Sequence, residues 1–255
     1  MRPYNILINS EMIKKNKTIE TIPGIFEFMP NVYDVLMELP FRIGKLCDDE
    51  DFEMVQIQDY FQLFVHDTSF KIRNIFNLME IGSYSDACII FRTLVESFIV
   101  YKYFILRKDG TGLSKYFAVN PLERSKVRIK DIFENVVPGY YDDLYSDLCM
   151  QTHGNPLIQA MFKGNVSKDT PIKSNINNIN LDWFSYITNQ LLPLIIGIIN
   201  LYKYAYPDNT INEKEELVGK INIINEFINN DIEKRRTLFP KQIKMINYYN
   251  KMIEI

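Results

Sequence analysis

The chain has 255 residues, of which 47% are hydrophobic and 13% aromatic, and its formal net charge is −3. This hydrophobic content excludes an intrinsically disordered chain, because it supplies enough apolar surface for a large core. The negative charge excludes a general nucleic-acid coat, which needs a basic excess to displace counterions from phosphates, but it allows a small local RNA site. Glycines and prolines fall mostly between long apolar stretches, which favours an all-α protein.

The first half of the chain predicts an arm followed by a helix hairpin. We expect residues 1–24 to form an irregular N-terminal arm, and residues 31–47 a helix that breaks near Pro40. Acidic residues just before position 52 favour a helix start there, because they offset the helix dipole. Helices over about 52–81 and 84–107, joined by a short glycine-containing turn, are then expected to pack antiparallel as a hairpin.

The second half predicts shorter helices around one long connection. Residues 112–136 are expected to form a more polar helix that breaks at Asn120-Pro121, and residues 140–152 another helix. A long irregular loop or small hairpin is expected at about 154–180. Further helices are expected over 181–206 and within 210–255, the latter broken at Phe239-Pro240.

No internal repeat, low-complexity tract or linker divides the sequence. We therefore predict an all-α helical bundle that forms a single domain over residues 1–255. Its parts are the arm at 1–24, the core bundle at 25–206 and the C-terminal helices at 207–255.

Residues 184–206 are long enough to cross a bilayer, but their composition favours a buried helix. Polar side chains and Pro193 interrupt the apolar run, whereas a membrane span has ~20 mostly apolar residues. We therefore expect no membrane partner. Three scattered cysteines suit reduced thiols, and the N-terminus lacks the apolar core of a signal peptide, so we expect a cytoplasmic protein.

Metal and cofactor sites are not expected. The two histidines and three cysteines show none of the spacings of zinc ligands, and the chain has no glycine-rich phosphate-binding loop.

One polar pair stands out within the most apolar helix of the first half. Arg92 and Glu96 are four residues apart, so they are neighbours on a helical face that they share with Cys88, Ile99 and Tyr103. On such a face both charges are expected to be at least half-buried, and each needs a partner. Two interpretations remain open: a structural pair that ties the helix to its neighbours, or a charged functional site.

His153 favours a functional site. It follows the predicted helix 140–152 and stands beside a glycine, and an imidazole at a helix end can be tuned to act as an acid or a base.

Two segments carry a resemblance to a known family. Residues 81–104, IGSYSDACIIFRTLVESFIVYKYF, place an Arg…Glu pair after a turn of small residues. Residues 140–156, YYDDLYSDLCMQTHGNP, place a Tyr, a small residue and a His in a pattern of the form L-S-x-x-x-H, with Cys149 at the small-residue position. Over about residues 55–160 the chain resembles an all-helical bacterial family described as a domain of unknown function, which is distantly similar to the HEPN superfamily.

HEPN proteins are α-helical bundles, often dimeric, and many are metal-independent ribonucleases of toxin and antiviral systems. Their usual Arg-x-x-x-x-His motif is absent here, because Leu148 stands five residues before His153 and Phe61 five before His66. The resemblance implies a homodimeric, RNA-acting effector of a bacterial defence or toxin system.

In a metal-independent endoribonuclease of this kind, Arg92 would bind the phosphate and Glu96 would orient it. His153 would be the base for the 2′-hydroxyl, with Tyr145 as a possible helper. The alternative is a non-enzymatic helical module that binds a protein partner or senses a signal. In that case the 154–180 loop and the charged C-terminal helices would be its contact surfaces.

Overall fold

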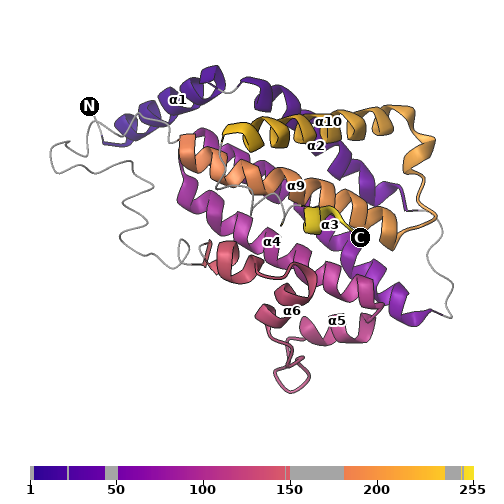
Figure 1. Ribbon diagram of the computed structural model, residues 1–255. Coiled ribbons are helices and arrows are strands. Elements are labelled where there is room, and N and C mark those ends of the chain that lie inside the picture. The colour runs from indigo at the N-terminus through magenta and orange to yellow at the C-terminus, as the bar shows by residue number, and fades with distance from the viewer. Residues whose placement is uncertain are drawn as a thin grey trace.

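The computed structural model describes residues 3–21, 23–43, 51–146, 148–149, 181–238, 248 and 250–255. Within these ranges every regular element is a helix and no strand is present, so the predicted all-α helical bundle is confirmed (Figure 1). The predicted loop at about 154–180 and the predicted break at Phe239-Pro240 lie outside the described residues. The predicted domain boundaries stay a prediction.

A long helix hairpin forms the centre of the bundle, as expected. Helix α3 (Phe52–Glu80) and helix α4 (Tyr84–Arg107) lie side by side and antiparallel (Figure 1). Their facing sides are apolar at helical spacing, and burial of these side chains drives the pairing. The buried residues of the two facing sides include Phe61, Phe64, Val65, Ile72, Phe91, Leu94, Val95 and Phe98.

The joint of this hairpin is a helix C-cap that needs glycine. Gly82 has a φ of 75°, a left-handed conformation that side chains with a Cβ rarely adopt. Its N–H donates to the carbonyl of Met79 at 3.0 Å, and the N–H of Ser83 donates to the carbonyl of Leu78 at 2.7 Å. These two bonds satisfy the last carbonyls of α3 and turn the chain into α4.

Helix α9 (Leu181–Ala205) is the buried third member of the centre. All residues from Ile187 to Ile199 are buried, and α9 lies against α3 and α4 (Figure 1). Buried hydrogen bonds fix its end, because Gln58 Nε2 donates to the carbonyl of Ala205 at 2.8 Å and Tyr206 donates to the carbonyl of Gln58 at 2.5 Å. Among the described residues, no helix is long and apolar enough to span a bilayer.

The prediction of an irregular arm at residues 1–24 was wrong. Residues Pro3–Thr21 form helix α1, and helix α2 begins at Pro23 and ends at Glu38, followed by a 3₁₀ turn, η1 (Leu39–Phe41). Tertiary contacts hold α1 on the bundle: Thr18 is 1% exposed, and Lys15 forms an ion pair with Glu80 at 2.8 Å. The arm was expected to extend to residue 24, but α2 already begins at Pro23, because proline is favoured in the first turn of a helix.

The region 112–136 contains two short helices rather than one. Helix α5 (Gly110–Tyr116) and helix α6 (Ile129–Val136) are separated by irregular residues 117–128. The predicted break at Asn120-Pro121 falls inside this connection, which is longer than expected. After α6 the chain enters a π-helical turn, η2 (Tyr141–Tyr145), and residues 146, 148 and 149 are helical.

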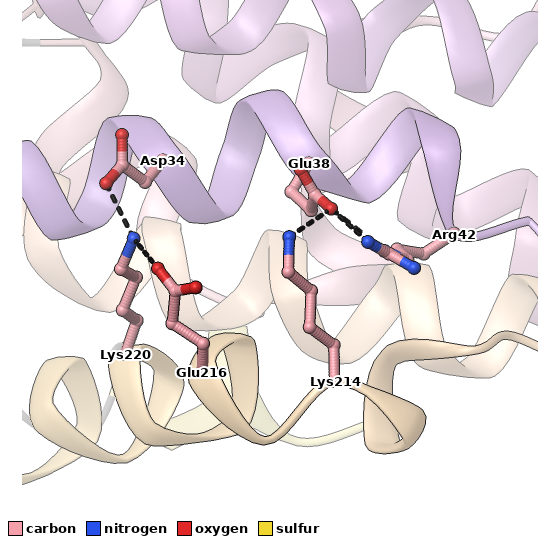
Figure 2. Close-up of polar contacts among 6 residues, drawn as sticks. All are labelled: Asp34, Glu38, Arg42, Lys214, Glu216 and Lys220. Atoms are coloured by element: carbon pink, nitrogen blue, oxygen red, sulfur yellow. Dashed lines mark hydrogen bonds and ion pairs between the residues drawn. The ribbon is translucent and has the colours of Figure 1, made fainter.

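Helix α10 (Glu215–Leu238), which follows the 3₁₀ turn η4 (Ile211–Glu213), packs along α2. Phe28 and Phe227 stack between them with ring centroids 4.1 Å apart. Figure 2 shows two ion pairs elsewhere between the two helices: Lys214 binds Glu38 at 2.7 Å, and Lys220 binds Asp34 at 2.8 Å. Because these pairs face solvent, they contribute little to stability, so the apolar contact is the main attachment.

Candidate functional site

The side chains of Arg92, Tyr145 and Glu96 form one hydrogen-bonded chain. Arg92 and Glu96 lie one turn apart on α4, and Tyr145 reaches them from the end of η2. The Nε of Arg92 donates to the hydroxyl oxygen of Tyr145 at 3.4 Å, and this hydroxyl donates to Oε2 of Glu96 at 2.5 Å. Two segments that are far apart in sequence therefore meet through a tyrosine hydroxyl.

The surroundings of the three side chains differ. Tyr145 is only 2% exposed, whereas Arg92 and Glu96 are half-buried. The prediction that both charges are at least half-buried is thus confirmed. The polar chain therefore runs from a buried phenol to two partly exposed charged groups.

Protonation at this site is set by burial and by the hydrogen bonds. Burial, followed by the hydrogen bond to Glu96, raises the pKa of the Tyr145 phenol well above its ordinary value of 10.0. The hydrogen bond to Tyr145 raises the pKa of the Arg92 guanidinium. At neutral pH Tyr145 is therefore a neutral donor toward Glu96, and Arg92 is a fixed cation.

Aromatic packing holds Tyr145 in place. Its ring lies 4.5 Å from the ring of Phe133 on α6 and 5.3 Å from that of Tyr141, measured between centroids. Phe133 is fully buried and also stacks with Tyr140 at 5.9 Å. This cluster fixes the ring, so the direction of the hydroxyl depends on packing rather than on the hydrogen bonds alone.

The sequence named these three residues but did not predict how they are connected. Arg92 and Glu96 were expected to form a pair, yet among the described residues they form no direct ion pair, and the Tyr145 hydroxyl lies between them. Cys149, at the small-residue position of the second segment, is half-buried and near enough to raise the pKa of both Arg92 and Tyr145 electrostatically. His153 lies outside the described residues.

Lys102 is a polar residue that the sequence analysis did not single out. It lies on α4, is 2% exposed, and its Nζ donates to the carbonyls of Lys251 at 2.8 Å, Met252 at 3.0 Å and also Glu254. Burial lowers its pKa to about 8. The available signal was a lysine within the apolar stretch from Phe98 to Ile105. Its bonds hold the C-terminal residues on α4, so its role is structural.

Metal binding was not expected, and the part of the chain that the structure describes contains no group of three His, Cys, Asp or Glu side chains placed to hold a metal ion.

No family model matches the chain, and no curated protein or solved structure matches it. The HEPN-like interpretation therefore stays a prediction from the two motif segments.

Chemically, the site combines a permanent cation with a carboxylate, both partly exposed, on a rigid apolar helix. A guanidinium suits a phosphate because it is a planar, always-charged donor. The neutral phenol between the two groups separates them and keeps the carboxylate oriented.

Proposed function

We propose that this protein is a HEPN-like helical bundle that cleaves RNA without a metal ion, as an effector of a bacterial defence or toxin system. The observation that supports it best is the chain of hydrogen bonds from Arg92 through Tyr145 to Glu96. It holds a half-exposed cation on α4 beside the helical segment that precedes His153 in sequence.

In this proposal Arg92 binds the scissile phosphate and stabilises the negative charge that grows on it during attack. His153 accepts the proton of the ribose 2′-hydroxyl. The 2′-oxygen bonds to phosphorus and the bond from phosphorus to the 5′-oxygen breaks. The leaving oxygen takes up a proton from solvent, and the protonated His153 returns its proton to solvent. The products are a 2′,3′-cyclic phosphate and a 5′-hydroxyl, so no water is consumed and no metal ion is required.

Glu96 and Tyr145 act as positioning residues. Tyr145 donates to Glu96 and accepts from Arg92, and the second bond restricts the orientation in which the guanidinium can meet the phosphate. Preorganised donors accelerate a reaction because they need not reorient in the transition state, so loss of the Tyr145 hydroxyl is expected to lower the rate without abolishing it.

The test is incubation of purified protein with total RNA in the presence of a chelator. Wild-type protein is expected to cleave, whereas Arg92→Gln and His153→Gln are expected to lose ~100-fold or more in rate. His66→Gln and Arg73→Gln are the matched controls, because both residues are exposed on α3 and have no role in the proposal. Equal cleavage by wild-type protein and the Arg92 and His153 variants would exclude this site.

A second function, a non-enzymatic module that binds a protein partner, is favoured by one observation. The buried Tyr145 hydroxyl contacts both Arg92 and Glu96, as a structural tie between α4 and η2 would require. If no version of the protein cleaves RNA while Arg92→Gln and Tyr145→Phe both lower stability, this second function is preferred.

A further inference from the structure

Residues 117–128, which connect α5 to α6, form a closed and internally ordered loop. At its base the N–H of Ser125 donates to the carbonyl of Lys115 at 3.0 Å. At its tip the side-chain oxygen of Asn120 accepts from the N–H of Leu122 at 3.1 Å, and the Asn120 amide donates to Glu123 at 2.9 Å. These bonds and the fixed φ of the intervening proline give the tip one preferred conformation.

The tip places two apolar side chains almost entirely in water. Val119 is 97% exposed and Leu122 is 94% exposed. The loop projects from the end of the bundle where α5 and α6 lie (Figure 1). Single exposed apolar residues are common on protein surfaces. Two apolar residues at the tip of an ordered, projecting turn form a small apolar patch that water solvates poorly.

Basic residues lie near this apolar tip in the sequence. Between residues 115 and 128 there are four Lys or Arg residues and one acidic residue, Glu123, although the whole chain carries a charge of −3. Arg124 and Lys126 are exposed and form no ion pair with the described residues, whereas Arg128 pairs with Asp131 at 2.8 Å. Two exposed cations therefore lie within seven positions of Val119 and within four of Leu122 in the same loop.

We propose that the tip of loop 117–128 docks on the surface of a lipid bilayer that carries anionic headgroups. Val119 and Leu122 enter the headgroup boundary, and Arg124 and Lys126 contact the anionic headgroups. Apolar side chains beside cationic ones are the combination that binds such surfaces. The inference goes beyond the proposed ribonuclease function and does not depend on it.

This docking does not need a membrane-spanning helix. The expectation of no membrane partner was argued from residues 184–206 alone, and the proposed contact of this loop with a bilayer surface departs from that expectation.

Other occupants of the tip fit the chemistry less well. Arg124 and Lys126 could also contact RNA phosphates, but the two side chains at the tip, Val119 and Leu122, offer no aromatic ring on which a base could stack. A second copy of the chain would bring the same basic side chains together, and two side chains bury far less than the roughly 800 Å² per partner of a stable interface. A planar anionic surface, in contrast, can contact a convex apolar tip and the cations that follow it in the loop.

The test is co-sedimentation of the full chain with vesicles of phosphatidylcholine, with and without phosphatidylserine. Wild-type protein is expected to bind the phosphatidylserine vesicles and to dissociate as salt is raised. A Val119→Ser/Leu122→Asn double variant should bind these vesicles about tenfold more weakly, or worse. Arg124→Gln and Lys126→Gln should each weaken binding about fivefold.

Two control variants separate this loop from general surface effects. Leu63→Asn removes an apolar side chain that is 70% exposed on α3, where Asp59 and Asp67 are its neighbours one turn away. Arg73→Gln removes an exposed charge about 30 Å along α3 from Glu53, beside which α5 begins. Both are expected to bind vesicles as the wild type does.

Three results would overturn the inference. The first is equal wild-type binding to both kinds of vesicle, and the second is unchanged binding by the Val119/Leu122 variant. The third is a change in the chain's oligomeric state in that variant, which assigns the tip to a second copy. An RNA gel shift provides one further contrary result: RNA affinity lost in the Arg124 and Lys126 variants while vesicle binding is unchanged.

Discussion

Removal of the Tyr145 hydroxyl group tests the site geometry directly. Tyr145→Phe keeps the buried ring and its contact with Phe133 but removes the donor to Glu96 and the acceptor for Arg92. Hydrogen bonds to charged groups contribute about 1.5–3 kcal/mol to stability. Because Arg92 and Glu96 are partly exposed, water replaces part of this loss, so we expect about 1–2 kcal/mol of destabilisation.

Urea unfolding followed by circular dichroism measures this change. With a slope of about 3 kcal/mol/M for a chain of this size, the midpoint is expected to fall by about 0.3–0.7 M, with an unchanged slope. Tyr141→Phe is the matched control, because Tyr141 lies on the same turn and its hydroxyl forms no hydrogen bond with the described residues. A double-mutant cycle with Glu96→Gln should give a coupling energy of about 1 kcal/mol. If the Tyr145 and Tyr141 variants unfold at the same urea concentration, the hydrogen-bonded chain does not stabilise the fold as reasoned.

Three further predictions concern other parts of the bundle. Lys102→Met keeps the aliphatic stem but removes the buried donors to the C-terminal carbonyls, so amide hydrogen exchange in residues 250–255 should accelerate about tenfold or more. Unchanged exchange would show that Lys102 does not hold the C-terminal residues on α4. Burial raises the pKa of the Cys88 thiol from 9.0 to about 12, so this group's contribution to stability is full below pH 9 and decreases by about 1.4 kcal/mol per pH unit above it. Cys88→Ala should therefore lose stability less steeply between pH 9 and 12 than the wild type, and equal slopes would contradict the burial of the thiol. Gly110→Ala places a Cβ 2.2 Å from a backbone oxygen of α3 and should destabilise the protein by roughly 2 kcal/mol or more. Gly219→Ala, with open space around it in α10, should stabilise the protein by about 0.5–1 kcal/mol. Thermal melts of both variants measure these two changes, and equal melting temperatures would contradict the packing at Gly110.

The long helices could be predicted from sequence because their signals are local. The hydrophobic period of α3 and α4, the acidic start at Asp51 and the glycine at position 82 all lie within a few residues of the boundaries they set. The predicted hairpin therefore agrees with the structure to within one residue at its ends. The burial of α9 followed from the same reasoning, since a long apolar segment with scattered polar residues needs a protein core around it.

The errors in the predicted N-terminal region have two causes, tertiary contacts and the position of a proline. Helix α1 has little amphipathic pattern of its own and is held by contacts such as the Lys15–Glu80 ion pair, which its local sequence does not reveal. The start of α2 was misplaced, since a helix was expected from residue 31 and α2 begins at Pro23, a first-turn proline.

In the candidate site, too, local sequence predicts some features, whereas others depend on how distant segments pack. Spacing alone placed Arg92 and Glu96 on one face, and composition alone showed that this face is apolar. The bridging position of Tyr145 depends on how η2 packs against α4, since Tyr145 lies 49 positions after Glu96 in the sequence. The π-helical turn that directs Tyr145 has no signature in its sequence, so the tyrosine could be named as a helper but not placed.

The chemical nature of the RNA ends produced in chelator tests the central claim most directly. Wild-type protein should leave 2′,3′-cyclic phosphate and 5′-hydroxyl ends, and Arg92→Gln should leave the RNA intact under the same conditions. Ends that carry 3′-hydroxyl and 5′-phosphate groups, or RNA that stays intact with the wild type, would contradict attack by the 2′-hydroxyl at a site built on Arg92.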